Sequence, residues 1–177
     1  MAFNINEIKS QLTFGGAKAS LFQVAITNPI DGAGDLKTPF MVQAAQIPAA
    51  TVGVIEVPYF GRKVKIAGDR TFAEWTVTVI NDEDFLIRNA MEAWMASINS
   101  HEGNVTAGND YKNQAQITQY AKTGSPLRTY NFNGLFPTNI GDITMDWNTT
   151  DEIETFESDT IKNVHFFIGD HIAKILD

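Results

Sequence analysis

The sequence predicts a mainly β protein, an antiparallel β-sandwich or barrel with one flanking α-helix. The segment 72–80 alternates apolar and polar side chains, as a strand does when one face meets a core and the other meets water. The segment 84–99 carries one apolar stripe at helical spacing. Most other segments are short β-type runs between turn formers, and such runs close most naturally into a sandwich or barrel.

The first part of the chain predicts an arm followed by strands. Residues 1–19 combine a weak helical pattern at Ile5, Ile8 and Leu12 with two glycines, so we expect an arm with a short helix. The turn-rich segment 28–35 predicts a loop. We then expect strands at 20–27, 39–47, 52–57 and 62–67, with turns at 58–61 and 68–70.

The strand 72–80 and the helix after it carry the clearest patterns. Ala73, Trp75, Val77 and Val79 form the face expected on the core, and Glu74, Thr76 and Thr78 form the wet face. Residues 81–84 supply N-cap candidates and carboxylates that favour a helix start. The helix should lie on the sheet through an apolar stripe made of Ile87, Met91, Trp94, Met95 and Ile98.

The second part of the chain predicts more strands after a polar loop at 100–112. In the segment 142–148, Ile143, Met145 and Trp147 alternate with polar residues, so all three tryptophans of the chain are expected in the core. The end of the chain allows one bent strand or two, and then a short helical tail. The expected strands are 113–121, 127–136, 142–148, 152–156 and 161–168, with a turn at 137–141.

Composition fits one domain, residues 1–177, without chemistry that depends on cysteine. The chain has 44% hydrophobic residues and no cysteine, so disulfides and thiolate metal sites are excluded. It has no apolar run long enough to span a membrane and no signal-peptide pattern at its start. The net charge of −8 argues against a protein that binds nucleic acid through its phosphates.

The charges are unevenly distributed. Four bases gather in the segment 62–70, whereas nine acids and two lysines follow from Asp142 onward. The simpler interpretation is two solvated surfaces. The alternative is that one end of the molecule meets the opposite end of a copy.

No catalytic, cofactor or metal site is expected. The three histidines are scattered, and no nucleophile elbow, phosphate loop or dinucleotide fingerprint occurs. The carboxylates of Asp82, Glu83 and Asp84 are explained by helix capping. Asp151, Glu152 and Glu154 do not have the spacing of an EF-hand, so nothing favours an enzyme.

Two long segments resemble the tail tube proteins of contractile-tailed bacteriophages, a family related to type VI secretion and tailocin tubes. They are "IAGDRTFAEWTVTVIND" and "GLFPTNIGDITMDW". The resemblance covers roughly residues 20–157 and fades in the arm 1–19 and in a divergent C-terminal extension, 158–177.

This resemblance implies a hexameric ring with a continuous inner β-barrel, and rings that stack head to tail. It also implies a virion protein that is assembled in the host cytoplasm. Implied partners are further copies, the tail sheath protein, the baseplate hub or tube initiator, the tape measure protein and the tail terminator. Genomic DNA would pass through the channel without specific binding.

Within that family, two groups of residues are expected to mediate assembly. The basic hairpin would contact the next ring through Arg62, Lys63, Lys65, Asp69 and Arg70. The wet face of strand 72–80 would line the lumen with Glu74, Thr76 and Thr78, where acids repel DNA phosphates.

Three alternatives remain from the sequence. The nearest is a tube subunit of a tailocin, a type VI secretion system or another phage-like contractile injection system. A monomeric β-sandwich that binds carbohydrate through exposed aromatics is the second, and it predicts an aromatic patch outside the core. An enzyme is the third.

Overall fold

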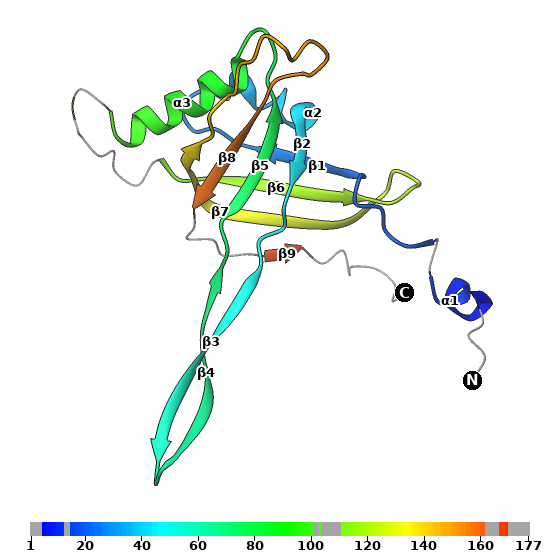
Figure 1. The fold of residues 1–177 in the computed structure, drawn as a ribbon, viewed down its shortest axis with the longest axis vertical. Coiled ribbons are helices and arrows are strands. Elements are labelled where there is room, and N and C mark those ends of the chain that lie inside the picture. The colour runs from blue at the N-terminus through cyan, green and yellow to red at the C-terminus, as the bar shows by residue number, and fades with distance from the viewer. Residues whose placement is uncertain (1–4, 13–14, 101–102, 104–110, 162–166, 170–177) are drawn as a thin grey trace, which may run out of the picture.

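The computed structural model describes residues 5–12, 15–100, 103, 111–161 and 167–169 of the chain. The described part is mainly β, with one long helix (Figure 1). Its elements are α1 (Ile5–Gln11), β1 (Phe22–Ile26), the 3-10 turn η2 (Gly32–Gly34), α2 (Thr38–Met41), β2 (Val42–Ala45), β3 (Ala50–Tyr59), β4 (Arg62–Phe72), β5 (Trp75–Ile80), α3 (Leu86–Ile98), β6 (Asn113–Tyr120), β7 (Pro126–Ile140), β8 (Thr155–Ile161) and β9 (Phe167–Gly169).

Among the described residues, seven strands form one antiparallel sheet that folds into two crossing layers. The strand order is β1-β6-β7-β8-β5-β2, and β9 pairs with β7 beside this path. The first part of β7 pairs with β6, and its last part, from Phe136 to Ile140, pairs with β8. The sheet therefore changes layer along β7 (Figure 1). The path ends in the strands β1 and β2, so the sheet is not closed within the described part of the chain.

A glycine marks the point where β7 changes its partner. The register between β6 and β7 shifts so that Gly134 is skipped between the pairs Gln114–Asn133 and Asn113–Leu135. Gly134 has a φ of 74°. An extra residue in the left-handed conformation is typical of a β-bulge, which bends a strand. The bend carries the end of β7 to β8.

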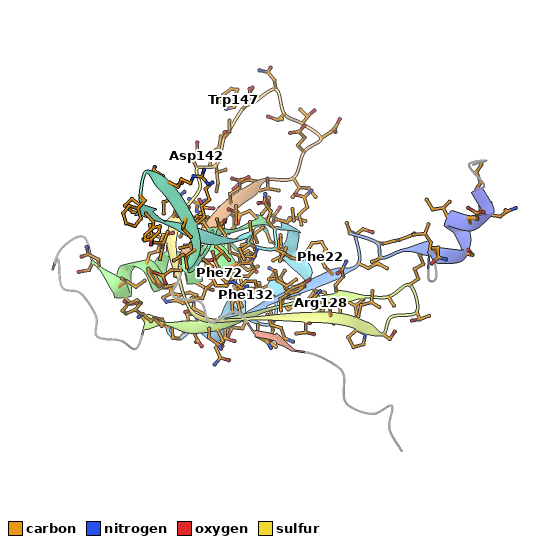
Figure 2. The ribbon with its side chains drawn as sticks, turned by 90° about the horizontal axis from the view of Figure 1, so that it is seen from below. Phe22, Phe72, Arg128, Phe132, Asp142 and Trp147 are labelled. Atoms are coloured by element: carbon orange, nitrogen blue, oxygen red, sulfur yellow. The ribbon has the colours of Figure 1, made fainter. Side chains whose placement is uncertain are left out.

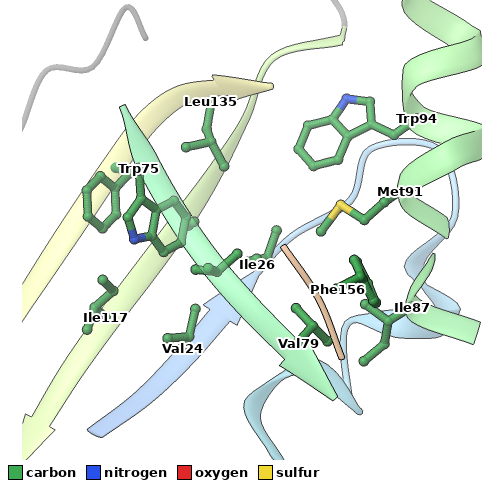
Figure 3. Close-up of a cluster of buried hydrophobic side chains, with 13 residues drawn as sticks. Val24, Ile26, Trp75, Val79, Ile87, Met91, Trp94, Ile117, Leu135 and Phe156 are labelled. Carbon is green, nitrogen blue, oxygen red and sulfur yellow. The ribbon is translucent and has the colours of Figure 1, made fainter. Parts of the chain in front are cut away.

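The core lies between the two layers, as the alternation of 72–80 predicts. Trp75, Val77 and Val79 on β5 are fully buried, and Trp75 stacks on Phe132 with ring centroids 4.6 Å apart. Helix α3 closes one end of the core with Ile87, Met91 and Trp94 (Figure 3). The predicted helical stripe is thus confirmed for these three residues and for Ile98, which packs against the core, but not for Met95, which is only partly buried. Trp94 also donates a hydrogen bond to the carbonyl of Tyr111.

The short helix expected in the arm is confirmed as α1, and strands are confirmed at 20–27, 52–57, 62–67, 113–121 and 127–136 with adjusted ends. Two strands are described in the C-terminal region, β8 and β9. The strand expected at 152–156 is shifted, because β8 begins only at Thr155 and runs to Ile161, and residues 162–166 of the strand expected at 161–168 lie outside the described residues. The residues of the expected helical tail, 170–177, lie outside the described residues.

The strand expected at 39–47 is wrong in its first half. Residues Thr38–Met41 form one helical turn, and only Val42–Ala45 are extended. Pro39 explains this, because its fixed φ suits the first turn of a helix.

The turn expected at 68–70 is also wrong, since β4 runs through these residues to Phe72. The register shifts between the pairs Val52–Arg70 and Val54–Ala67, so two residues of β4 face the single Gly53. Gly68 therefore belongs to a β-bulge within the hairpin and not to a turn that reverses the chain. Strand β5 accordingly starts only at Trp75, and Ala73 is exposed instead of buried.

The segment 137–148 differs most from the prediction. Residues 137–140 continue β7 and do not form a turn, and residues 142–148 form no strand. Ile143 packs on the core, but Met145 and Trp147 are 79% and 99% exposed. The prediction that Trp147 belongs to the core is therefore wrong, whereas it is confirmed for Trp75 and Trp94.

Candidate assembly surfaces

The β3–β4 hairpin extends away from the two-layered body as a separate two-stranded ribbon (Figure 1). It continues the β2–β5 pair outward. Two backbone hydrogen bonds connect the pairs, from Ala73 N to Ala49 O at 2.8 Å and from Gln46 N to Thr76 O at 3.3 Å. The sheet thus fixes the base of the hairpin while leaving its far end without support from the body.

One face of the hairpin is mostly apolar, and the other carries the charged residues Glu56, Lys63 and Lys65. Cross-strand partners share a face, so the pairs Ile55–Ile66 and Val57–Val64 place four aliphatic side chains together, with Tyr59 beyond them. All five side chains are between 41% and 66% exposed. An isolated two-stranded hairpin is at best marginally stable in water. This apolar face therefore needs a partner surface.

All five predicted contact residues lie on strand β4. Lys63 pairs with Glu56 across the hairpin, with 2.7 Å between Nζ and Oε2. Arg62, Lys65 and Arg70 form no ion pair with any described residue. The hairpin thus presents three cationic groups that are available to a partner.

The tip of the hairpin is an aromatic pair in a strained turn. Phe60 and Gly61 have φ values of 44° and 79°, as the two central residues of a type I′ turn require. A bulky residue at positive φ is unusual. The ring of Phe60 contacts that of Tyr59 edge to face at 4.6 Å and is itself 90% exposed. Such an outlier points to a use for the side chain.

Two of the three expected lumen residues lie together on the outer face of the β5–β8 pair. Thr76 and Thr78 stand opposite Asp159 and Glu157. Thr76 Oγ1 donates a hydrogen bond of 2.7 Å to Asp159 Oδ1. Glu74 precedes the strand and is exposed. This outer surface is polar and acidic.

The outer face of the β1–β6–β7 layer is polar without charge. Gln114 and Gln116 on β6 lie beside Asn131 and Asn133 on β7, and they line a shallow depression of about 440 Å³. The two layers therefore present chemically different outer faces, one acidic and one made of amides.

Sequence reasoning missed the segment 141–154, called here the acidic loop. It contains five carboxylates and no base, from Asp142 to Glu154. Its exposed apolar side chains are Met145, Trp147 and Ile153. The alternation of 142–148 suggested a strand and hid this surface. The polar run "NTTDE" directly after Trp147 was the signal for a loop.

The carboxylates before α3 bind a lysine from another part of the chain. Lys37 Nζ lies 2.7 Å from Asp82 Oδ2 and 2.6 Å from Asp84 Oδ2. The hydrogen bonds that Lys37 donates lower the pKa of both carboxyl groups. The same bonds raise the pKa of Lys37, the bond to Asp82 having the largest effect and the bond to Asp84 the next largest. The predicted N-cap is wrong, because the cap residue is Phe85 and no side chain caps it. Asp84 nevertheless accepts a hydrogen bond from Leu86 N.

Within the described residues, no three His, Cys, Asp or Glu side chains come together in a way that could hold a metal ion. No helix in that part of the chain is long and apolar enough to cross a membrane.

Comparison with known proteins gives a consistent family. A family model described as "Phage tail tube protein" matches residues 5–160. The chain is 40% identical to tail tube protein gp19 of Enterobacteria phage T4 over 145 residues, which are 80% of this chain and 85% of that protein. It is 26% identical to the tail tube protein of Serratia phage KSP90 over 162 residues, 88% and 92% of the two chains.

Solved structures share the fold at lower identity. The sheath/tube terminator of the extracellular contractile injection system PVC matches with a TM-score of 0.62 and 17% identity, over 85% of this chain and 95% of that one. A chain of the PVC sheath-tube complex matches with a TM-score of 0.59 and 17% identity, over 94% and 99%. These likenesses show the fold.

Proposed function

The chain belongs to the phage tail tube protein family, and from this premise we propose that its copies form hexameric rings that stack head to tail into the tube of a contractile tail. Such a tube conducts genomic DNA to the host when the sheath contracts. The observation that carries the proposal is the β3–β4 hairpin, an exposed ribbon with an apolar face that the body of the subunit leaves uncovered.

The energetics of the hairpin favour self-association. Burying a large apolar side chain contributes roughly 1.5–3 kcal/mol, so covering five that are about half exposed contributes on the order of 5 kcal/mol per hairpin. Every subunit carries one hairpin, and the contribution repeats around each ring. Contacts between different surfaces of identical copies need not close, which gives a filament.

The open sheet supports a shared inner barrel. Its strand path ends in β1 and β2, and exposed strand edges are templates for pairing with another chain. Joining layers from six copies would remove the free edges. The acidic outer face around Thr76, Thr78 and Glu74 would then line the lumen. Carboxylates there repel phosphates and let DNA pass without binding.

The partners follow from the same role. The tube would be surrounded by the tail sheath protein, start at the baseplate hub, end at a terminator and hold the tape measure protein before ejection. Similarity to chains of a sheath-tube complex, a terminator and a baseplate supports the first three. Members of the family are virion components, and assembly would take place in the host cytoplasm.

Electron microscopy of the purified protein tests the proposal. Negative-stain images should show six-fold rings or hollow tubes, either with the protein alone or after addition of its baseplate nucleus. A protein that stays monomeric in both conditions would contradict ring formation and tube assembly together.

Cysteine labelling tests which outer face lines the lumen. The chain has no cysteine, so Thr78→Cys and the matched control Gln116→Cys each introduce a single reactive thiol, one on each outer face. A bulky maleimide should modify both variants as free subunits. In assembled tubes it should still modify position 116 but not position 78. Equal protection of both, or protection of 116 alone, would overturn the lumen assignment.

A tube subunit of a tailocin or another contractile injection system remains the alternative, because the PVC structures share the fold. The particle would have the same wall and a different cargo. Nuclease-protected DNA leaving native particles on contraction supports the phage tail, and particles without DNA support the alternative.

A further inference from the structure

The acidic loop and the tip of the hairpin lie at opposite ends of the molecule. In Figure 1 the hairpin points down from the body along the longest axis, and the loop between β7 and β8 stands at the top. A copy stacked along this axis would present its hairpin tip toward the end of its neighbour that carries the acidic loop. The two surfaces can therefore meet between copies that stack head to tail.

The loop presents its tryptophan on an ordered turn. Asp146 Oδ1 accepts hydrogen bonds of 2.9 Å from Asn148 N and Asn148 Nδ2, and Asp146 O accepts one of 2.8 Å from Thr149 Oγ1. These bonds hold the turn around Trp147, which stands away from the body in Figure 2. An indole that is 99% exposed on a hydrogen-bonded turn is positioned for a partner.

The loop also forms a groove of mixed chemistry. Met145, Trp147 and Ile153 contribute apolar surface to an open groove of about 540 Å³, and Asp142 and Glu152 lie on its wall. Its occupant should therefore combine an apolar or aromatic group with positive charge.

The hairpin tip has this combination. Tyr59 and Phe60 supply two exposed rings, and Arg62, one residue further on after Gly61, is a cation without an ion pair among the described residues. The strand next to it has three further bases. The loop has five acids and no base, so the charges of the two surfaces are complementary.

We propose that the groove of the acidic loop, centred on Trp147, is the docking site for the hairpin tip of the adjacent copy in the stack. Phe60 and Tyr59 pack against Trp147 and Met145, while Arg62 meets the carboxylates of the loop. This proposal rests on the proposed function, and it adds the acceptor surface for the hairpin.

Tryptophan fluorescence tests the proposal on the unaltered protein. Trp75 and Trp94 are buried, so quenching by acrylamide reports mainly on Trp147 in the free subunit. In bare tubes the quenchable emission should fall to the level of the Trp147→Phe variant measured as free subunits. Tubes in which the emission stays as quenchable as in free subunits would overturn the docking site and leave tube formation intact.

The same measurement separates two other outcomes. If Trp147 is quenchable in bare tubes and becomes protected only when sheath protein is added, the loop binds the sheath and the proposal is wrong. If the protein forms no rings or tubes even beside its baseplate nucleus, the proposed function fails, and the docking site fails with it.

Cross-linking provides the positional test. A double variant with Phe60→Cys and Trp147→Cys should form a disulfide-linked ladder in oxidised tubes, because each chain then carries one donor and one acceptor. The matched control combines Phe60→Cys with Leu36→Cys, since Leu36 is also a strongly exposed apolar residue. The control should give no ladder. Tubes of the first variant without a ladder, or equal ladders from both, would contradict the proposed contact.

Discussion

At the scale of single residues, the described part of the core holds two polar side-chain atoms without a hydrogen-bond partner. Trp75 Nε1 and Ser158 Oγ are buried and unpaired among the described residues. A buried hydroxyl without a hydrogen bond loses its solvation and gains nothing in return. The inner face of β8 therefore carries an avoidable cost at Ser158.

Replacing this serine should stabilise the subunit. We expect Ser158→Ala to raise the free energy of unfolding by about 1 kcal/mol, because the unpaired hydroxyl disappears and only a small volume is lost. Urea denaturation of the monomeric protein measures it. The control is Thr160→Val, which should destabilise, since Thr160 Oγ1 donates a hydrogen bond to Trp75 O. A clear loss of stability in Ser158→Ala would indicate a partner for the hydroxyl.

The Lys37 cluster predicts a dependence of stability on pH. The pKa values of Asp82 and Asp84 lie below the usual 3.8, so their pairing with Lys37 contributes to stability above that pH. The contribution is lost as the pH falls through the lowered pKa values. We expect Lys37→Met to lower the melting temperature at pH 7, and the difference from the parent should close as the pH falls below 3.8 through the lowered pKa values. Calorimetry at pH 7 and along an acidic pH series checks this, and a difference that persists at every acidic pH would contradict it.

At the scale of elements, the sequence predicted those strands and helices best in which a single apolar periodicity was not interrupted by turn-forming residues. Strand β5 and helix α3 each bury a single face, and both faces are read directly from the spacing of their apolar residues. The hairpin strands were also found. Their packing was not, because no local pattern states that an apolar face will meet another copy.

The errors arose where local signals have two meanings. Gly68 marked a bulge inside β4 and was interpreted as a turn, since glycine favours both. The alternation around Trp147 matched a strand, although the chain leaves the sheet after β7 and no strand among the described residues pairs with that segment. The exposed Trp147 also fits the aromatic patch expected of a carbohydrate-binding sandwich. Family membership decides against that interpretation.

The bulge in β7 gives a prediction at this scale. Gly134→Ala should destabilise the subunit by roughly 1–2 kcal/mol, because a side chain disfavours the left-handed conformation that the bend requires. Gly32→Ala is the control, since Gly32 has ordinary φ and a Cβ there would meet only Asp35 Oδ2, at 3.7 Å. Chemical denaturation compares the two. Equal losses of stability in the two variants would show that the left-handed conformation of Gly134 is not the cause of the destabilisation.

At the scale of the whole molecule, charge is separated along the longest axis. The hairpin, at one end, is basic, and the acidic loop is at the other end (Figure 1). A single exposed ion pair contributes only about 0.2–1 kcal/mol. Six copies per ring would multiply that contribution. The charges would also determine that the hairpin end of one subunit meets the acidic-loop end of the next.

This separation of charge should be required for assembly. Reversing Lys63, Lys65 and Arg70 to glutamate should prevent or strongly weaken polymerisation, because the hairpin would then repel the acidic loop of the neighbour. Circular dichroism should show an unchanged fold, since all three side chains are exposed. The matched control reverses Lys18, Lys112 and Lys122, which changes the net charge equally outside the hairpin. Electron microscopy and sedimentation compare the variants, and high salt should weaken assembly of the parent protein by screening. Tubes of normal length from the hairpin variant, or loss of tubes in both variants, would show that the distribution of charge does not direct stacking.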